Sequence, residues 1–277
     1  MIARVNQALT TRLLLLFLFV ALPLLLAGRQ EKRTVEDVQT DFDKLANTGG
    51  EWKSLFNGTT FDGWSRTLQG GHEDRLDDVF RVADDGSILI TGEMLGALTL
   101  DGVHGDYHLK FETKFGNKRW PPREDATPNG GLLYHGHGPA DAVAGVWHRS
   151  IEHQGQQGDR GDAHFLAGPN ATVAVSGQPQ TWDPAGEQKL AGGRVLKRGD
   201  FETDGWNTLE LIVRGDEAWH VVNGRVVMHL TKLVDQGGKP LTKGIIQFQS
   251  ELAEIHYRNL EMRKLPGTNS GTNAGEN

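Results

Sequence analysis

The chain contains no cysteine among its 277 residues. It therefore has no disulfide bond to support the fold and no thiol to act as nucleophile or metal ligand. An excess of positive charge is also missing, since the formal net charge at pH 7 is −7. A nucleic-acid-binding surface would be basic, so the composition argues against this class of partner. It favours a neutral substrate over an anionic one, and no segment resembles a dinucleotide site.

Long apolar runs are absent with one exception, near the N-terminus. Residues 1–30 hold three arginines and no acidic residue, and the apolar run Leu13 to Ala27 follows Arg4 and Arg12. This is the order of a secretory signal, and the run is shorter than the roughly 20 residues that a membrane span prefers. We expect residues 1–30 to be a signal peptide or an uncleaved N-terminal anchor, which would be the only contact with a membrane. The protein is then exported, to the periplasm or the extracellular space.

Residues 31–50 are polar and charged and are predicted to be a linker. A short helix is expected around Thr34–Leu45, because four apolar side chains recur there at helical spacing. These side chains are Val35, Val38, Phe42 and Leu45.

The main domain is predicted to span residues 51–265 and to consist almost entirely of strands. Residues 107–115 alternate between apolar and polar side chains, which is typical of an antiparallel sheet with one wet face. Asn223-Gly224 is a strong hairpin signal, because both central positions of such a turn favour positive φ. A change of apolar phase in the last strand predicts a β-bulge near Asn259. Regularly spaced strands, with 36 glycines available for turns, indicate a two-sheet sandwich.

Two insertions and a tail interrupt or follow the strands. Residues 118–129 contain Trp120, and the Gly- and Pro-rich residues 168–199 contain Trp182. Loops this long in a compact domain are commonly functional or disordered. Each tryptophan either stacks on a sugar or pins its loop to the body of the domain. Residues 266–277 are rich in Gly, Asn and Thr and are predicted to be a disordered tail.

Two strand-like runs, residues 130–137 and 146–154, carry the polar side chains that point to chemistry. Successive residues of a strand face opposite sides of the sheet. One face of the second run is therefore predicted to hold His148, Ser150, Glu152 and Gln154. Its other face is predicted to hold Trp147, Ile151 and His153. In the first run, His135 and His137 fall on one face together, and such polar rows suit a surface that handles saccharides.

Glu152 is the first candidate for a catalytic carboxylate, because a charged residue in mid-strand is costly unless it is exposed or paired. The alternative is a structural salt bridge with Arg149 or Arg160. His135 is the second candidate, as a general base or acid, since histidine titrates near neutrality. A structural histidine with satisfied hydrogen bonds is an equally good interpretation.

The same region offers candidate ligands for substrate and metal. The groups predicted to bind the substrate are Gln154, His148, Trp120 and Arg149. His135, His137 and Glu152, with His148 beside them, are the residues that could bind a divalent ion, for which imidazole and carboxylate ligands favour zinc or manganese. Chance spacing among eleven histidines is the competing interpretation of this set.

An ordered set of short motifs points to a known family. The motifs are Ser54-Leu-Phe-Asn-Gly58, Phe61-Asp-Gly-Trp64, Gly105-Asp-Tyr107, Asn129-Gly-Gly131, Glu152-x-Gln154, Gly158-Asp-x-Gly-Asp162, Trp206-Asn207, Val222-Asn-Gly224 and Tyr257-Arg-Asn259. None is specific alone, but in this order the chain resembles the 3-keto-disaccharide hydrolase family, also described as 3-keto-glucoside 1,2-lyase/3-keto-2-hydroxy-glucal hydratase domains. The resemblance covers about residues 51–265. It implies an all-β, concanavalin A-like jelly-roll β-sandwich, in which a concave sheet and its rim loops form a sugar cleft.

The sequence departs from the family pattern at three places. Relatives commonly have Ser where Gly130 stands, an aliphatic residue where Gly155 stands, and Phe-Arg where Tyr134-His135 stands. A glycine such as Gly155 within a central strand weakens the strand or marks a bulge.

The resemblance implies cleavage of 3-keto-glycosides by proton abstraction at C2, elimination and hydration. This reaction needs a base of suitable pKa and donors for the enolate oxygen. The oxidised carbohydrate would come from a separate oxidoreductase. Two alternatives remain: a non-catalytic, lectin-like carbohydrate-binding module, and a conventional glycoside hydrolase. The latter needs a second carboxylate opposite Glu152, and the sequence alone singles out no such residue.

Overall fold

The structure is a computed structural model that describes residues 32–267. The predicted signal segment and nearly all of the predicted tail lie outside these residues. The chain divides into two units, Met1–Arg33 and Thr34–Asn277, and the strands all belong to the second. Among the described residues, no helix has both the length and the apolar character needed to cross a membrane.

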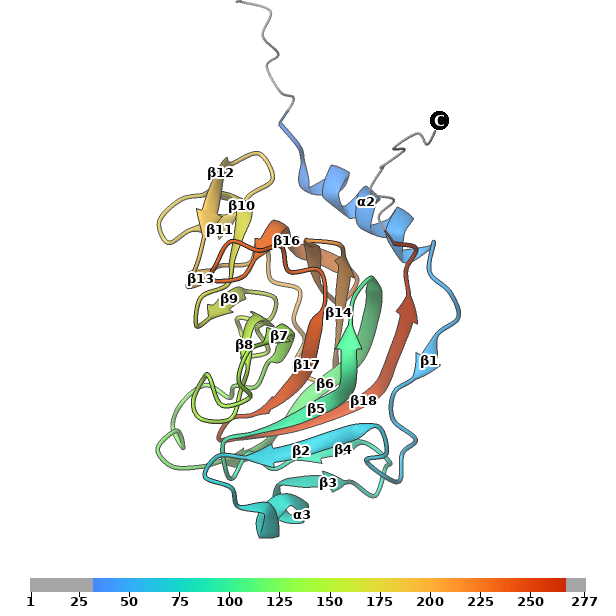
Figure 1. The fold of residues 1–277 in the computed structure, drawn as a ribbon, viewed down its shortest axis with the longest axis vertical. Helices are drawn as coiled ribbons and strands as arrows, with labels where there is room; N and C mark the ends of the chain where they lie inside the picture. The colour runs from blue at the N-terminus through green and yellow to red at the C-terminus, as the bar shows by residue number, and fades with distance from the viewer. Residues whose placement is uncertain (1–31, 268–277) are drawn as a thin grey trace, which may run out of the picture. The chain divides into compact units, whose positions relative to one another are not determined.

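The second unit contains two antiparallel sheets, which Figure 1 shows as two layers. The strands of the larger sheet are β1 (Lys53–Ser54), β3 (Phe80–Val82), β4 (Ile88–Ile90), β6 (Tyr107–Arg119), β10 (Asn170–Ser176), β11 (Thr181–Trp182), β12 (Glu187–Ala191), β14 (Asn207–Arg214), β15 (Glu217–Val222), β16 (Arg225–Val234) and β18 (Ala253–Lys264). Those of the smaller sheet are β2 (Trp64–Leu68), β5 (Gly96–His104), β7 (Leu132–His137), β8 (Arg149–His153), β9 (Ala163–Leu166), β13 (Arg194–Val195) and β17 (Gly244–Ser250). The helices within residues 32–267 are α2 (Val35–Ala46), the 3-10 turn η1 (Glu73–Arg75) and α3 (Leu76–Val79).

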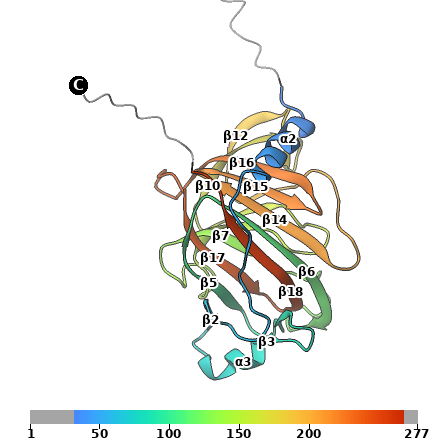
Figure 2. The same ribbon diagram turned by 90° about the vertical axis from the view of Figure 1, so that its right-hand side faces the viewer.

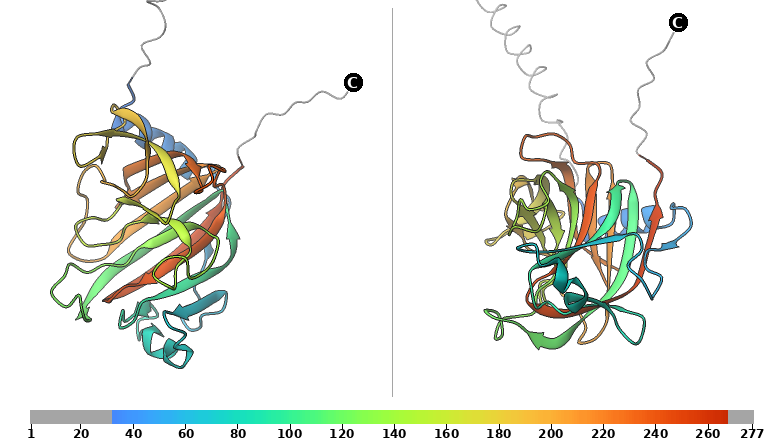
Figure 3. Two further views of the ribbon diagram at one scale, coloured as in Figure 1. Left: turned by 60° about the vertical axis from the view of Figure 1, so that its left-hand side comes forward. Right: turned by 60° about the horizontal axis from the view of Figure 1, so that its bottom comes forward.

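Strands far apart in the sequence are neighbours in both sheets. The larger sheet runs β11-β10-β16-β15-β14-β6-β18-β4-β3, with β1 beside β18 and β12 beside β10. The smaller sheet runs β13-β9-β8-β7-β17-β5-β2. Figures 2 and 3 show the two sheets from further sides. This topology confirms the predicted jelly-roll β-sandwich.

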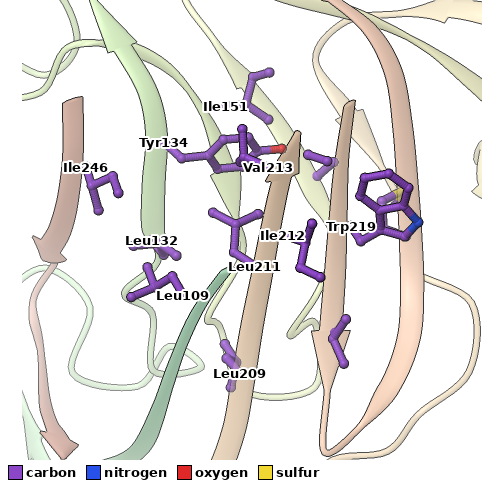
Figure 4. Packing of buried hydrophobic residues seen from close by; sticks show 14 of the residues in the cluster. Leu109, Leu132, Tyr134, Ile151, Leu209, Leu211, Ile212, Val213, Trp219 and Ile246 are labelled. Atoms are coloured by element: carbon purple, nitrogen blue, oxygen red, sulfur yellow. The ribbon is translucent and has the colours of Figure 1, made fainter. Parts of the chain in front are cut away.

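The core lies between the sheets. Leu132 and Tyr134 of β7 face Leu211 and Val213 of β14, and all four side chains are buried (Figure 4). Each such side chain contributes about 1.5–3 kcal/mol when it leaves water. The residues alternate along each strand, so one face of each sheet supplies the core.

The alternation predicted for residues 107–115 is confirmed in β6, where Tyr107, Leu109 and Phe111 are buried. The other face was predicted to be wet, but His108 on that face is only 2% exposed. The ring of Phe42 in α2 packs edge-on against the ring of His108, with 5.9 Å between the two centroids. Nε2 of His108 lies 2.8 Å from Oε2 of Glu210. The helix therefore covers part of the outer face of the larger sheet.

The predicted helix before the domain is confirmed as α2, with Thr34 as its N-cap. Its side chains Val38 and Phe42 are buried against the outer face of the larger sheet. Gln39 accepts a hydrogen bond from the backbone N–H of Val226 and donates one to the carbonyl of Gly224. The segment predicted as a linker thus contains a helix that packs on the sandwich.

Both predicted backbone irregularities are present. Asn223 and Gly224 join β15 to β16 with φ of 49° and 77°, as the hairpin signal required. The register of β18 against β6 shifts between Arg258 and Glu261, and Asn259 between them has φ 53°. The bulge predicted near Asn259 is confirmed.

The prediction of an irregular insertion over residues 168–199 is wrong. These residues form β10 to β13, which extend the edges of both sheets. Trp182 of β11 is 1% exposed, so it anchors this region to the core. Glycines and polar residues hid these strands from sequence analysis, because short edge strands do not need a continuous apolar pattern.

Candidate functional site

The face of the smaller sheet that points away from the core carries a polar row. Residues directly opposite in an antiparallel pair project to the same face. Glu152 of β8 lies opposite Leu133 of β7 and His164 of β9, while Gln249 of β17 lies opposite Ala97 of β5. We call this surface the site face.

A cavity of about 560 Å³ lies at the site face. Its lining is Asn129, Trp147, Glu152, Gln154, Gln156, His164, Phe165, Leu166, Gly193, Arg194, Gln249 and Glu251. The volume is typical of a small-molecule pocket, for which roughly 300–1,000 Å³ is usual. Six separate segments of the chain contribute, so the cavity exists only in the folded domain.

Glu152 is the most perturbed acid in this cavity. Its pKa is raised to about 8, chiefly by burial and also by Glu251 and Asp162, while Arg194 opposes the shift. The side chain is 4% exposed and its Oε1 has no hydrogen-bond partner. A Cβ at Gly131 would lie 2.2 Å from this oxygen, so the glycine leaves room for the carboxyl group. The arrangement gives a carboxyl group that can exchange a proton near neutral pH.

His164 is the imidazole closest to this carboxyl group, with Nδ1 3.8 Å from Oε2 of Glu152. Burial, with a further contribution from Arg194, lowers its pKa to about 4. His164 is therefore neutral at pH 7 and adds no positive charge beside Glu152.

Glu251 is a second carboxyl group in the same cavity. Arg123 forms an ion pair with it at 2.8 Å, and Asn129 forms a side-chain hydrogen bond to it. Its pKa is still raised, because burial outweighs both partners. Sequence analysis missed Glu251, although its spacing from Gln249 at the end of a strand was a usable signal.

Two amides in the cavity are held by their oxygen atoms. Oε1 of Gln154 accepts hydrogen bonds of 2.8 Å from the N–H groups of Gly155 and Gln156. Oε1 of Gln249 accepts one of 2.7 Å from the N–H of Gly131. Each amide can then turn its NH₂ group to an acceptor such as a sugar oxygen.

Arg194 supplies the cation of the cavity. Its guanidinium group lies 2.6 Å from Asp162 and 2.9 Å from Asp159. Asp162 also accepts a hydrogen bond of 2.7 Å from the N–H of Lys197. Arg194 was missed because it lies in the region predicted to be an irregular insertion.

Of the residues predicted to form the site, the structure brings Glu152 and Gln154 to the cavity. Arg160 pairs with Glu202 and not with Glu152. Trp147 was predicted to share a face with Ile151, and this prediction is wrong. Trp147 precedes β8 and forms a bridge with Val143, so the alternation of the strand does not reach it.

His135 does not line the cavity. The register of β7 against β8 shifts between Tyr134 and His137, and His135 has φ 53°, which breaks the predicted alternation. Its ring is buried 5.3 Å from the ring of Tyr134, and neither ring nitrogen has a hydrogen-bond partner. Burial lowers its pKa to about 3, so the imidazole is neutral.

The proposed metal ligands are not assembled. His137 bonds to the carbonyl of His135 through Nδ1 and to Gln236 through Nε2, and Glu152 lies in the cavity. In residues 32–267, no group of three or more His, Asp or Glu side chains is arranged to hold a metal ion.

Three residues predicted to bind the substrate lie elsewhere. Nδ1 of His148 bonds to the carbonyl of Gly138 at 3.0 Å. Arg149 lies opposite His137 at the far end of β8 from Glu152 and is not part of the cavity lining. Trp120 donates through Nε1 to the carbonyl of Thr91 at 2.8 Å, so this tryptophan pins its loop to the body of the domain.

The departure from the family pattern at Gly155 has a structural reason. A Cβ at this position would lie 1.9 Å from the carbonyl oxygen of Gly130. The two backbones approach too closely for any side chain at 155. Gly155 thus allows close backbone contact between two segments, one containing Asn129 and the other Gln154, both of which line the cavity.

Comparison with known proteins gives similar structures at low identity. The "putative glycosyl hydrolase" of Parabacteroides distasonis ATCC 8503 is 17% identical with a TM-score of 0.50, covering 78% of this chain and 94% of that one. A second structure of that description is 16% identical with a TM-score of 0.47, covering 78% and 100%. A protein with a galectin-like fold from Bacillus subtilis is 10% identical with a TM-score of 0.46, covering 80% and 98%. At 17% identity, the similarity to the first of these structures concerns the fold alone.

No curated protein matches the chain. The family model does match, over residues 51–263, which is more than half of the chain and nearly the range in which the ordered motifs occur. The resemblance seen in the sequence is confirmed, and the protein belongs to the family of the 3-keto-alpha-glucoside-1,2-lyase-like domain.

Proposed function

We propose that this domain cleaves 3-keto-glycosides by elimination followed by hydration. Membership of the family supports a function on carbohydrates. The observation that carries the specific proposal is Glu152, a buried carboxyl group at a cavity, with a pKa of about 8 and one oxygen atom without a partner.

The chemistry needs a base near C2, hydrogen-bond donors for the enolate oxygen and a proton for the leaving group. A ketone at C3 acidifies the hydrogen on C2, and Glu152 removes that proton. The electrons of the C2–H bond form an enolate, which then expels the glycosidic oxygen as the C1–O bond breaks. The departing oxygen takes up a proton. Water then adds across the C1=C2 bond of the resulting enone, its oxygen to C1 and a proton to C2, which gives net hydrolysis.

The other polar groups of the cavity have roles in this scheme. The NH₂ groups of Gln154 and Gln249 donate to the enolate oxygen and to sugar hydroxyls. Glu251, whose pKa is also raised, supplies the proton to the departing oxygen. Because His164 is neutral, it adds no positive charge to that of Arg194, which alone opposes the raised pKa of Glu152.

The setting of the reaction is part of the proposal. A separate oxidoreductase supplies the ketone. Residues 1–30 export the protein to the periplasm or the extracellular space, or hold it at the membrane. The N-terminal composition supports this location.

The test compares paired glucosides that differ only in the 3-keto group. The protein should release the aglycone from the keto compound alone, and in D₂O the recovered substrate should carry deuterium at C2. Glu152→Gln should abolish both signals, whereas Glu261→Gln, on the larger sheet, should leave both unchanged. Cleavage of the plain glucoside alone would end the elimination mechanism. Loss of activity with a chelator, and recovery with one ion, would assign a metal.

A conventional glycoside hydrolase is the second candidate, because Glu152 and Glu251 line one cavity. Such enzymes use two carboxyl groups separated by roughly 5–10 Å. This candidate predicts cleavage of the plain glucoside and no exchange at C2. A binding module, the third class, would bind sugar without turnover and keep its affinity in Glu152→Gln.

A further inference from the structure

The segment between β7 and β8, residues 138–148, crosses the site face. Nε1 of Trp147 donates to the carbonyl of Gly96 on β5 at 2.8 Å. Nε2 of Gln69, which follows β2, donates to the carbonyl of Ala144 at 2.7 Å. In the sheet order, β7 and β17 separate β8 from β5, so the segment extends over both of them. We call residues 138–148 the strap.

The strap is packed onto the sheet by its own apolar cluster. Val146 and Trp147 are buried against Ala97 and Leu133, in a cluster separate from the main core. Ala97 and Leu133 lie opposite Gln249 and Glu152 and so project from the site face. The strap therefore fills part of the face along which a longer sugar chain would lie.

Trp147 is also a wall of the cavity that holds Glu152. It is buried, as are Glu152, Gln154 and Gln249, whereas Gly193 and Arg194 are exposed. The cavity is thus bounded by Trp147, near the end of the strap, and its most exposed lining residues lie beside β13. Trp147 and the strap close one side of it.

We propose that Trp147 is a specificity-determining residue that ends the sugar pocket, so that the protein accepts the terminal unit of a glycoside and rejects a unit within a chain. The inference rests on the proposed function for the identity of the substrate. A terminal unit carries one extension, which leaves through the mouth beside Arg194. An internal unit carries a second extension, which would collide with the indole ring and the strap.

The experiment measures binding by calorimetry in the Glu152→Gln background, which prevents turnover. The probes are a glucose disaccharide with the target glucose at its end, and the trisaccharide in which that glucose carries a further glucose at O4. Both are used with and without the 3-keto group. The trisaccharide should bind about tenfold more weakly or worse, because it meets the closed wall.

Three further substitutions test the wall. Trp147→Ala should bring the two affinities to within about threefold of each other, because the steric block is gone. Trp147→Phe retains an aromatic wall and should keep most of the discrimination. Gln69→Ala removes one anchor of the strap without touching the cavity lining, and should relax the discrimination in part. It also serves as the test if Trp147→Ala does not fold, as judged by circular dichroism.

The preference for sugar-chain length tests the role of Trp147, whereas the preference for the 3-keto group tests the proposed function. Equal binding of disaccharide and trisaccharide by the parent protein would overturn the role of Trp147, whatever the ketone does. Discrimination that persists in folded Trp147→Ala and Gln69→Ala would overturn it as well. Discrimination by length without preference for the ketone would support the closed pocket and count against the elimination chemistry. Binding of none of the four probes would overturn both.

Discussion

Two adjacent residues of β8, Glu152 and His153, are both buried, and they face opposite sides of the same sheet. Glu152 projects into the cavity on the site face. His153 is fully buried in the core, stacked on His220 with ring centroids 4.3 Å apart. His220 in turn bonds to the hydroxyl of Tyr134 at 3.0 Å and to the carbonyl of Gly161.

Burial pushes both groups toward their neutral forms. It raises the pKa of Glu152 to about 8 and lowers the pKa of His153 to about 4. The two residues differ in access: Glu152 lies where a ligand can meet it, whereas both ring nitrogens of His153 are enclosed without a partner. A perturbed pKa alone therefore does not identify a site in this domain, and the cavity decides between the two residues.

The largest effect is expected from Glu152→Gln. Loss of the base should reduce turnover of a 3-keto-glycoside by about 10²–10⁴-fold. The same change should stabilise the fold at pH 8–9. The pKa of Glu152 is 4.5 when unperturbed and about 8 in the fold, so the wild type loses stability as pH rises between these values.

Denaturant titrations at pH 5 and pH 9 measure the free energy of unfolding and so check the predicted change in stability. The Glu152→Gln protein should lose less stability than the wild type between the two pH values, by on the order of a few kcal/mol. Glu261→Gln, on the larger sheet, is the matched control and should follow the wild type. An unchanged turnover would show that Glu152 does not act as the base.

A smaller effect is expected from His153→Leu, and it falls on stability alone. The pKa of His153 is 6.5 when unperturbed and about 4 in the fold, so the wild type loses stability as pH falls between these values. The leucine cannot be protonated, and the variant should lose about 1–3 kcal/mol less between pH 7 and pH 4. Loss of stacking on His220 acts in the other direction at neutral pH.

Denaturant titration against pH measures this difference. The exposed His72 provides the control, because His72→Leu should leave the acid limb unchanged. Turnover of His153→Leu at neutral pH should stay near that of the wild type. A large loss of turnover in a stably folded variant would contradict the assignment of His153 to the core alone.

The smallest effect is expected from Arg123→Leu. Removing the cation beside Glu251 takes away an ion pair that lowers the pKa of this carboxyl group. Glu251 then keeps its proton to higher pH, and because it acts as the acid in the proposed reaction, the falling limb of the pH–rate profile should move up by about one unit. Activity near neutral pH should change little, and the gain should appear at the alkaline end of the profile.

A pH profile of kcat/KM checks this shift. Arg66→Leu removes an arginine that pairs with Asp77 outside the cavity, so its profile should not move. A fall in activity that is the same at every pH would show that Arg123 only holds the loop in place.

Local patterns in the sequence predicted much of the sandwich. Apolar alternation correctly predicted that Leu109 and Phe111 are in the core. The hairpin turn at Asn223-Gly224 and the bulge at Asn259 also occur at the predicted positions. These features depend only on residues that are close together in the sequence, so they can be predicted from the sequence alone. The face of Glu152 follows from the same rule, which is why it was the first candidate.

The rest of the site depends on which distant segments meet. Glu251, which follows β17, and Arg194, on β13, reach Glu152 only because each of these strands lies two places from β8 in the sheet order. Alternation gives the face of a residue but not its neighbours across the sheet. It also fails at irregular backbone, and for that reason His135 at its positive φ and Trp147 before β8 were misplaced.

Gly131 has a consequence for how this domain can vary. The site of its missing Cβ lies 2.2 Å from Oε1 of Glu152 and 2.9 Å from Oε1 of Gln249. Even alanine at this position would compete for the volume that the carboxyl oxygen occupies. Libraries that diversify the pocket should therefore hold residue 131 fixed and place their variation on the exposed side, around Arg194.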